Sequence, residues 1–200
     1  DRMTPARRHQ YLDRINGSVH LLLQMLDDLM MVAGMESGRL EFNPEQVDVL
    51  RFIDGIVDEF RLIDQGGHEI VFEEQVDVTI EADSKLLRQL IVNLISNAIK
   101  YAPTDTTIRI CLAEQPTYIE LLVEDQGIGI PPEDLPNLFE PFHRADNAKG
   151  FKGMGLGLTI VKQSVDLHGG TVSVESQVGY GTRFVVLLPK QHGSTLEIGF

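Results

Sequence analysis

The stretch SKLLRQLIVNLISNAIKY, residues 84–101, carries the pattern that decides the fold. Its apolar residues recur every three or four positions, which predicts a helix with one buried face; they are Leu87, Leu90, Leu94, Ile95 and Ala98. Beside that face, residues at positions i, i+4, i+7 and i+8 form a polar ridge that comprises Asn93, Asn97, Lys100 and Tyr101. Because asparagine is a poor helix former, two of them in mid-helix need a reason.

The ridge has two interpretations. An amide oxygen is a suitable ligand for Mg²⁺, which takes few protein ligands and completes its shell with phosphate oxygens and water. Lys100, one turn on, could reach the same phosphates. Taken alone, however, such a ridge is more often a set of solvated or capping residues. Whether the ridge binds a metal and phosphates therefore depends on the other motifs in the chain.

Helical and strand patterns interleave on both sides of this helix. Helical patterns run from Val47 to about Leu62 and from Gly155 to about His168. Strand patterns occupy residues 68–75, 78–82, 107–114, 117–125, 171–177 and 182–189. Strands in adjacent pairs with helices set apart indicate an α+β sandwich: one mixed or antiparallel sheet covered on one face by helices. Residues 126–153 are too long for an ordinary connection and predict a lid or binding loop.

The motif DQGIGI, residues 125–130, directly follows an apolar strand. The carboxylate of Asp125 can accept a hydrogen bond from a ligand amine, while Gly127 and Gly129 let a planar ring approach the backbone. Adenine offers its exocyclic amine as a donor, whereas guanine presents an acceptor oxygen and would be repelled. The alternative is a plain turn, because Asp and Gly dominate turns.

Two further motifs contain glycine. GMGLGL, residues 153–158, leads into a predicted helix, whose free N–H groups and positive dipole end suit an anion. It is not a Walker motif, because no lysine follows, and it is not a dinucleotide fingerprint, because no strand precedes it closely. GYGT, residues 179–182, is by itself a hairpin turn. Thr182 gains meaning only if the sheet brings it beside Asp125.

Residues 5–36 predict one long helix, which Thr4 can cap and Gly38 can close. Its heptad seam comprises Leu12, Ile15, Val19, Leu22, Leu26, Leu29 and Ala33. Extra apolar residues beside the seam favour a four-helix bundle made by two chains; the alternative is a core helix of the main domain. The predicted organisation is this helix in residues 1–38, a connector in 39–46, the main domain in 47–190 and a tail in 191–200.

Composition narrows the function. A formal net charge of −13 argues against a nucleic-acid binder, which would need a basic patch, but not against an anionic ligand held by a cation. The lone Cys111 excludes an intrachain disulfide and a cysteine zinc cluster. No apolar run approaches the ~20 residues of a membrane span, and no signal peptide opens the chain. We expect a cytoplasmic chain without membrane contact of its own; its parent protein could still be anchored.

In order along the chain, NLISNAIKY, DQGIGI, FEPFHR, GMGLGL and GYGTRF resemble the N, G1, F, G2 and G3 boxes of two-component sensor histidine kinases. The resemblance covers nearly all of residues 5–189. It implies a Bergerat-type α/β sandwich, preceded by a two-helix dimerisation and phosphoacceptor module of which residues 5–36 would be the second helix. It also implies a homodimer that uses Mg-ATP to phosphorylate a histidine, for relay to an aspartate in a response-regulator receiver domain.

The resemblance assigns roles to individual residues. The Mg²⁺ ligands would be Asn97 and Asn93. The adenine amine would meet Asp125, with Gly127, Gly129 and Thr182 near the ring. The phosphates would face Lys100, Arg144 and the backbone of Gly153, Gly155, Leu156 and Gly157. The base and sugar would be lined by Tyr101, Ile130 and Leu158, and the lid would hinge at Phe139 and Phe142. The catalytic residues would thus be Asn97, Lys100 and Arg144.

One family feature has no counterpart here. The family's acceptor box reads approximately His-Glu-Leu-Arg-Thr-Pro, and none of the six histidines fits it; they are His9, His20, His68, His143, His168 and His192. We therefore expect the phosphoacceptor histidine on a helix absent from this chain, either cut from the same protein or on another polypeptide.

Two other functional classes remain open. ATPases of the same fold, such as DNA gyrase, mismatch-repair ATPases and the large heat-shock chaperone, place a glutamate one turn before the metal-binding asparagine, where it activates water. Here that position is Asn93, and loss of a general base costs roughly 10²–10⁴-fold in rate, so efficient hydrolysis is not expected. The third class is a non-catalytic nucleotide-sensing or dimerisation module, against which the intact boxes argue.

Overall fold

The computed structural model describes residues 11, 26, 29–31, 33–34, 41–64, 67–74 and 78–193. The chain forms two compact units, Asp1–Leu40 and Glu41–Phe200. In the first unit, the described residues are helical, in agreement with the predicted long helix. Two members of the heptad seam, Leu26 and Leu29, are about half exposed. The other seam positions except Ala33 lie outside the described residues. Both predicted ends of the helix also lie outside them, and so do two of the histidines, His9 and His20.

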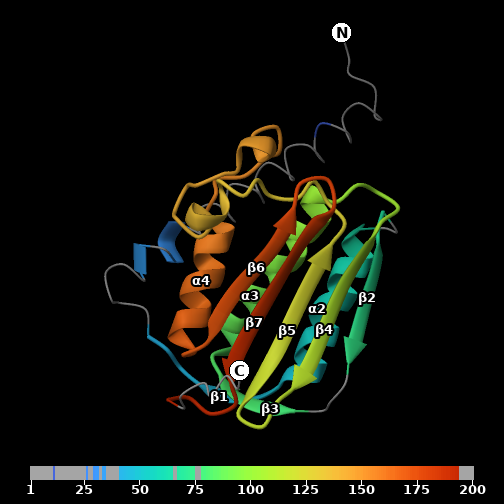
Figure 1. Cartoon of the computed structure of the whole chain (residues 1–200). Coiled ribbons are helices and arrows are strands. Elements are labelled where there is room, and N and C mark those ends of the chain that lie inside the picture. The colour runs from blue at the N-terminus through green and yellow to red at the C-terminus, as the bar shows by residue number, and fades with distance from the viewer. Residues whose placement is uncertain are drawn as a thin grey trace. The chain divides into compact units, whose positions relative to one another are not determined.

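The second unit is built on a five-stranded sheet with the strand order β2-β4-β5-β7-β6 (Figure 1). Strand β2 pairs parallel with β4, and every other pairing in this sheet is antiparallel. The sheet is therefore mixed, as predicted. Its strands are β2 (Glu69–Glu74), β4 (Thr107–Glu114), β5 (Tyr118–Asp125), β6 (Thr171–Gln177) and β7 (Gly181–Pro189).

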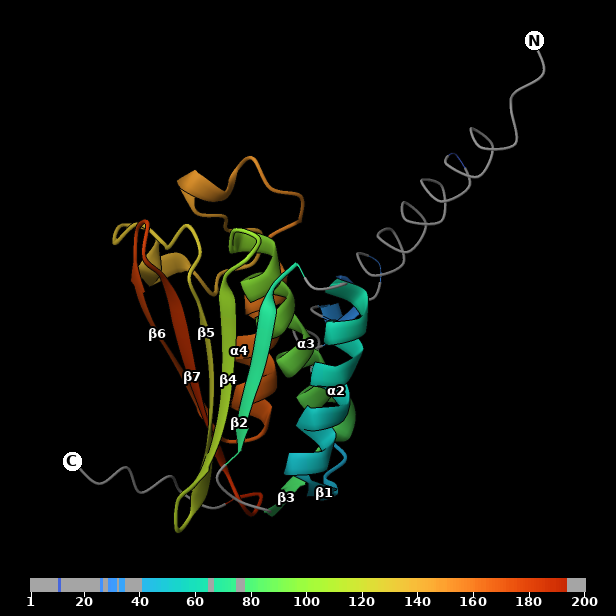
Figure 2. The same ribbon diagram turned by 90° about the vertical axis from the view of Figure 1, so that its right-hand side faces the viewer.

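Three helices cover one face of the sheet, which Figure 2 shows edge-on. They are α2 (Val49–Asp64), α3 (Ser84–Tyr101) and α4 (Gly157–Leu167). Helix α3 has the bounds that its periodicity predicts, and its apolar face is almost completely buried: Leu87, Leu90, Ile91, Leu94 and Ile95. Burial of this kind is the main stabilising term of a domain. None of the helices in the described part of the chain is long and apolar enough to cross a membrane.

A second, two-stranded sheet was not predicted. Strand β1 (Glu45–Asp48) pairs antiparallel with β3 (Thr79–Ala82), where a connector and the start of a helix were expected. The helix begins two residues later than predicted, at Val49, because Asp48 Oδ1 accepts the Arg51 N–H at 3.1 Å and caps it. A four-residue strand with a single fully buried side chain, Val47, carries too little alternation to be recognised. The prediction of one sheet is thus corrected to two.

The start of α3 is a junction of three segments. Asp83 caps the helix, since its Oδ1 accepts the N–H groups of Lys85 and Leu86. Its Oδ2 accepts the Asn43 N–H at 3.0 Å. Its own N–H donates to His168 Nε2 at 3.1 Å, and His168 Nδ1 lies 2.7 Å from the Ser164 carbonyl oxygen. A carbonyl can only accept, so Nδ1 carries the proton and Nε2 is the acceptor, which defines a neutral ring.

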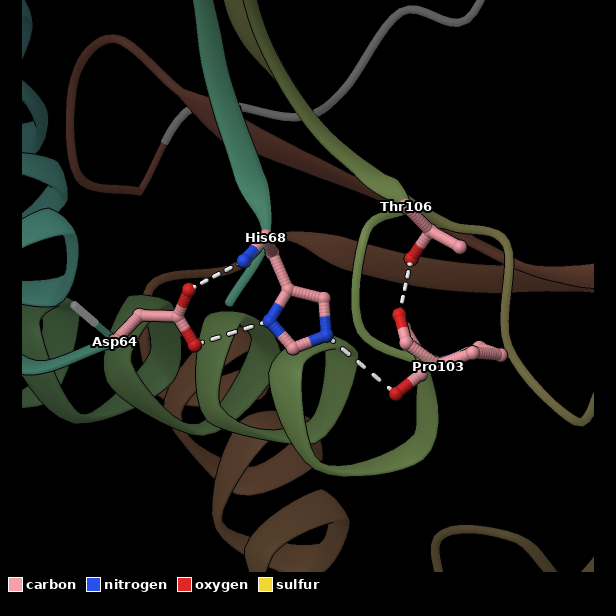
Figure 3. Close-up of polar contacts among 5 residues, drawn as sticks. Asp64, His68, Pro103 and Thr106 are labelled. Carbon is pink, nitrogen blue, oxygen red and sulfur yellow. Dashed lines mark hydrogen bonds and ion pairs between the residues drawn. The ribbon is translucent and has the colours of Figure 1, made fainter. Parts of the chain in front are cut away.

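The other end of α3 is held by the turn between α2 and β2 (Figure 3). Asp64 accepts the His68 backbone N–H at 2.6 Å and faces the His68 Nδ1 at 3.0 Å. His68 Nε2 lies 3.4 Å from the Ala102 carbonyl oxygen, just beyond the helix. Burial alone would raise the pKa of Asp64, but the hydrogen bonds and charge of His68 outweigh it and lower the pKa below its usual value. This pair fixes the helix end that bears Lys100 and Tyr101.

Candidate nucleotide-binding site

The motifs that are far apart in the sequence meet at one end of the sheet. The Ile128 N–H donates to the Tyr101 carbonyl at 3.1 Å, which joins the DQGIGI motif to the end of α3. The Gly179 N–H donates to the Ile128 carbonyl at 2.9 Å and adds the GYGT turn. The lid lies over the same end in Figure 1, and β1 and β3 lie at the opposite end.

Asp125 ends β5 and lies in register with Thr182 of β7. Both residues are buried, with 8% and 7% of their surface exposed. The Asp125 carboxylate accepts the backbone N–H of Gly127 at 2.7 Å and that of Thr182. Burial outweighs these hydrogen bonds and raises the pKa of Asp125 to about 6. The sheet therefore places Thr182 beside Asp125, which is the arrangement that a role for Thr182 in the site requires.

Glycine is needed at three positions of this region because neighbouring atoms lie too close to allow a Cβ. A Cβ at Gly127 would lie 2.6 Å from both Asp125 Oδ1 and the Tyr101 carbonyl oxygen. Gly129 has a φ of +65° and a Cβ there would lie 2.0 Å from the Gln177 carbonyl oxygen. Gly181 has a φ of +123°, and its Cβ would lie 1.9 Å from the Asp125 carbonyl oxygen. A side chain at Gly181 would therefore collide with the backbone of Asp125, one at Gly127 with its carboxylate and Tyr101, and one at Gly129 with the end of β6.

The polar ridge of α3 faces the GMGLGL motif. Asn93 Nδ2 donates to the Gln89 carbonyl at 2.9 Å, so its amide oxygen is the free end. A Cβ at Gly157 would lie 2.7 Å from that oxygen, and a Cβ at Gly153 would lie 2.8 Å from Lys100 Nζ. Among the described residues, no side-chain hydrogen bond involves Asn97. The ridge thus turns the Asn93 amide oxygen and the Lys100 ammonium toward the glycines, and Lys100 Nζ also donates to Tyr101 Oη at 2.9 Å.

Helix α4 begins at Gly157, two residues later than predicted, because Gly155 has a φ of +79° and forms the turn before it. Leu156 precedes the helix without a side-chain cap. The first N–H groups of a helix have no partner within it. The N–H groups at the start of α4 therefore remain available to an anion beside the α3 ridge.

The predicted lid contains two short 3₁₀ helices, η1 (Leu135–Asn137) and η2 (Asp146–Ala148). Arg144 lies within it, and its guanidinium donates to the carbonyl oxygens of Ala148 and Phe151 rather than pointing to the α3 ridge. The Phe151 ring lies 5.0 Å from the Tyr101 ring, so the lid touches the end of α3.

The two phenylalanines expected to hinge the lid differ in their surroundings. Phe139 packs against the core. Phe142 is 62% exposed and has a φ of +63°, which is strained for a residue other than glycine. Ile130 and Leu158, expected to line the base and sugar, also pack against the core. Their roles toward a ligand stay predictions.

Ser176 and Asn147 were not among the predicted site residues. Ser176 Oγ accepts the Ile130 N–H at 2.9 Å, donates to the Gly181 carbonyl at 2.8 Å and lies 2.9 Å from Thr182 Oγ1. Asn147 Nδ2 donates to the Gly129 carbonyl at 2.8 Å and ties the lid to the DQGIGI motif. A signal for Ser176 existed: in TVSVESQ it takes the inward place in an alternation whose other members are valines.

A cation at this site would depend on amide oxygens. The described residues contain no group of three or more His, Cys, Asp or Glu that could hold a metal ion. The free amide oxygens of Asn93 and Asn97 suit Mg²⁺, which completes its shell with ligand oxygens and water. The residues present therefore fit Mg²⁺ brought with a phosphate ligand.

Comparisons with known proteins agree with this geometry. Residues 82–192, more than half of the chain, match the family described as "Histidine kinase-, DNA gyrase B-, and HSP90-like ATPase". Sensor histidine kinase WalK of Bacillus subtilis is 34% identical over 84% of this chain and 28% of its own length. Circadian input-output histidine kinase CikA of Synechococcus elongatus is 33% identical over 92% of this chain and 25% of its own length.

Among solved structures, the mycobacterial sensor histidine kinase MprB has a TM-score of 0.66 and 31% identity, and the match covers 75% of this chain and 99% of that one. The chain spans about a quarter of the length of the curated relatives. It belongs to the family of histidine kinase-, DNA gyrase B- and HSP90-like ATPases, and within that family its second unit is a sensor histidine kinase catalytic domain.

Proposed function

We propose that this chain binds Mg-ATP and transfers the γ-phosphoryl group to a histidine on a helix absent from it, for relay to a response-regulator aspartate in a two-component system. The observation that carries the proposal is the convergence of Asp125 and Thr182, the α3 ridge and the start of α4 at one end of the sheet. This arrangement offers a buried acceptor for a base, amide oxygens for a cation and N–H groups for phosphates within one site.

The adenine base would bind at the strand ends. The Asp125 carboxylate would accept the exocyclic amine, and the backbone at Gly127 and Gly129 would lie along the ring. Thr182 would complete this end of the site. Tyr101, Ile130 and Leu158 would form its apolar sides.

The phosphates and Mg²⁺ would lie between α3 and α4. Asn97 and Asn93 would hold the cation through their amide oxygens. Lys100 and the backbone from Gly153 to Gly157 would contact the phosphates. Arg144 would join them after its guanidinium leaves the carbonyls of Ala148 and Phe151. When bound, Mg²⁺ neutralises charge on the phosphates; the protein positions the nucleotide for in-line attack.

The attacking group would be a histidine nitrogen, which forms the bond to the γ-phosphorus as the bond to the ADP oxygen breaks. Three of the four described histidines are held by partners within the fold, which favours an acceptor elsewhere; the fourth, His192, is exposed. His68 and His168 are enclosed in the fold by Asp64, Ala102, Asp83 and Ser164, and His143 Nε2 faces Asp134 Oδ1 at 3.4 Å. Asn93 has no proton-accepting side chain, so water would be activated poorly. The proposal includes a homodimer formed through the N-terminal helix, a receiver-domain partner and a cytoplasmic site of action.

Transfer of radiolabel from γ-labelled ATP tests the function. The chain alone should bind Mg-ATP and acquire almost no acid-labile phosphate, and a second fragment with the upstream helix and its histidine should become labelled when added. Asn97→Ala should abolish the Mg²⁺ dependence of binding and most of the labelling, whereas Lys85→Ala, an exposed site on the first turn of the same helix, should change neither. Strong acid-labile label on the chain alone would place the acceptor among its own six histidines and overturn the assignment.

A further inference from the structure

Ser176 lies where three backbone segments of the base-binding end meet. It belongs to β6, and its side chain points inward, between the end of the DQGIGI motif and the start of β7. Its hydroxyl oxygen contacts the Ile130 nitrogen at 2.9 Å, the Gly181 carbonyl oxygen at 2.8 Å and Thr182 Oγ1 at 2.9 Å. These three contacts use the full hydrogen-bonding capacity of a serine hydroxyl.

The directions of these hydrogen bonds follow from counting protons. A serine hydroxyl has one proton and two lone pairs. The Gly181 carbonyl can only accept, so it takes the Ser176 proton. The Ile130 N–H can only donate, so it occupies one lone pair. The remaining contact joins a lone pair of Ser176 to Thr182 Oγ1, and its proton must therefore come from Thr182.

Thr182 is thereby left as a hydrogen-bond acceptor. Its hydroxyl proton goes to Ser176 and its backbone N–H to Asp125, so only lone pairs of Oγ1 remain for a ligand. Asp125, in register with it, is also an acceptor. Two acceptors side by side attract the amine at position 6 of a purine and repel a carbonyl oxygen at the same position.

We propose that Ser176 is a positioning residue for nucleotide specificity: it binds the Thr182 hydroxyl proton and so makes the base-binding end an all-acceptor surface that selects 6-amino over 6-oxo purine nucleotides. This inference rests on the proposed binding of ATP at Asp125 and adds a residue to it. Without Ser176, the Thr182 hydroxyl rotates freely and donates to a 6-oxo group.

The test compares Kd for ATP and for inosine triphosphate, which carries a 6-oxo group and shares the ribose and phosphates. General damage to the fold or to the phosphate contacts lowers both affinities together and leaves their ratio unchanged. Ser176→Ala should reduce the preference for ATP by about tenfold, because one hydrogen bond is lost and one repulsion becomes an attraction. Ser176→Thr, which restores a hydroxyl, should recover the preference. Ser173→Ala, at an exposed position of the same strand, should leave it unchanged.

A double-mutant cycle shows whether Ser176 acts through Thr182. In a Thr182→Val background, Ser176→Ala should have no further effect on the ratio of the two Kd values. If the alanine variant does not fold, Ser176→Cys, whose thiol is a weak donor and acceptor, should shift the ratio in the same direction. An unchanged ratio in Ser176→Ala, or a shift that persists in Thr182→Val, would overturn the inference alone. If the unaltered chain binds neither nucleotide, the proposed function falls with it.

Discussion

Asn93 on α3 and Gly157 at the start of α4 are in direct contact: a Cβ at Gly157 would lie 2.7 Å from Asn93 Oδ1. Asn93 cannot simply turn away, because its Nδ2 donates to the Gln89 carbonyl at 2.9 Å. The absence of a side chain at Gly157 therefore leaves room for an amide oxygen that we assign to Mg²⁺.

Gly157→Ala should displace this amide and weaken the Mg²⁺-dependent part of ATP binding by roughly tenfold, since an oxygen that we assign to Mg²⁺ moves out of place. Titration calorimetry with and without Mg²⁺ measures the effect. Gly55→Ala is the matched control, because nothing lies within 4 Å of a Cβ in that helix. The control should stabilise the protein by about 0.5–1 kcal/mol through helix propensity and leave nucleotide binding intact. Unaltered Mg²⁺ dependence in Gly157→Ala would remove Asn93 from the metal site.

The buried carboxylate of Asp125 should lower the stability of the folded protein while it strengthens ATP binding. Its pKa rises from 3.8 when unfolded to about 6 when folded, so the folded protein holds this proton more tightly. The stabilising contribution is present below about pH 4 and is lost as the pH rises through about 6. Asp125→Asn should therefore raise the free energy of unfolding of the nucleotide-free protein by roughly 1–3 kcal/mol at pH 8, and by less at pH 5, in urea unfolding experiments.

The same substitution should weaken ATP binding by about ten- to a hundredfold, because a charge-assisted hydrogen bond becomes a neutral one. In the unaltered chain, ATP affinity should fall as the pH drops below about 6, where the carboxyl group is protonated. ATP bound equally well by both proteins across this pH range would contradict the assignment of the base to Asp125.

The lid should be ordered in two ways. In the nucleotide-free protein, Arg144 ties it together through the Ala148 and Phe151 carbonyls; with a non-hydrolysable ATP analogue, the phosphates should protect residues 131–153 further from hydrogen exchange. Arg144→Ala should speed exchange in the nucleotide-free lid and remove most of the added protection. Lys149→Ala, which removes an exposed lid cation, is the control. Equal exchange with and without the analogue would show that this segment does not close on the ligand.

His168 should make the fold sensitive to acid. Burial lowers the pKa of its ring below the usual 6.5, against the opposing effect of the Ser164 hydrogen bond, so the folded protein binds this proton less readily than the unfolded one. Stability should therefore fall as the pH drops below about 6.5, as the ring loses its acceptor for the Asp83 N–H. His168→Gln should flatten this dependence. The two proteins should be compared in an Asp125→Asn background, because Asp125 titrates over a neighbouring pH range with the opposite effect on stability. If His168→Gln leaves the pH dependence of the unfolding free energy unchanged, His168 is not its cause.

Hydrophobic periodicity within single segments was enough to predict some helices and strands and not enough to predict others. The bounds of α3 followed from its periodicity, and Asp83 supplies the cap at its start. The alternation in β4, β5 and β7 was strong because their inward residues are buried. By contrast, β1 depends on pairing with distant β3, and four residues hold no usable period.

The site divides in the same way. Asp125 and the glycines were recognisable because few residue types suit such close approaches. The meeting of Asp125 with Thr182 depends on the β5–β7 register, which no single segment contains. Ser176 was overlooked because its partners, Ile130 and the adjacent pair Gly181 and Thr182, come from two stretches that are separate from its own strand. Arg144 was assigned by its motif, whereas its contacts are made by lid carbonyls whose positions no motif encodes.

The hydrogen bond from the Ile128 N–H to the Tyr101 carbonyl joins two parts of the site that come mainly from different secondary-structure elements. The residues that we assign to the base come mainly from the ends of β5 and β7 and the loop after β5, with Tyr101 of α3 and Leu158 of α4 at its sides. Those that we assign to the metal and phosphates come mainly from α3 and the approach to α4. Substitutions in the strand ends can thus change which nucleotide is used while leaving the phosphoryl-transfer residues untouched. For protein engineering, this makes the domain a scaffold in which redesign for an orthogonal nucleotide can begin at the ends of β5, β6 and β7.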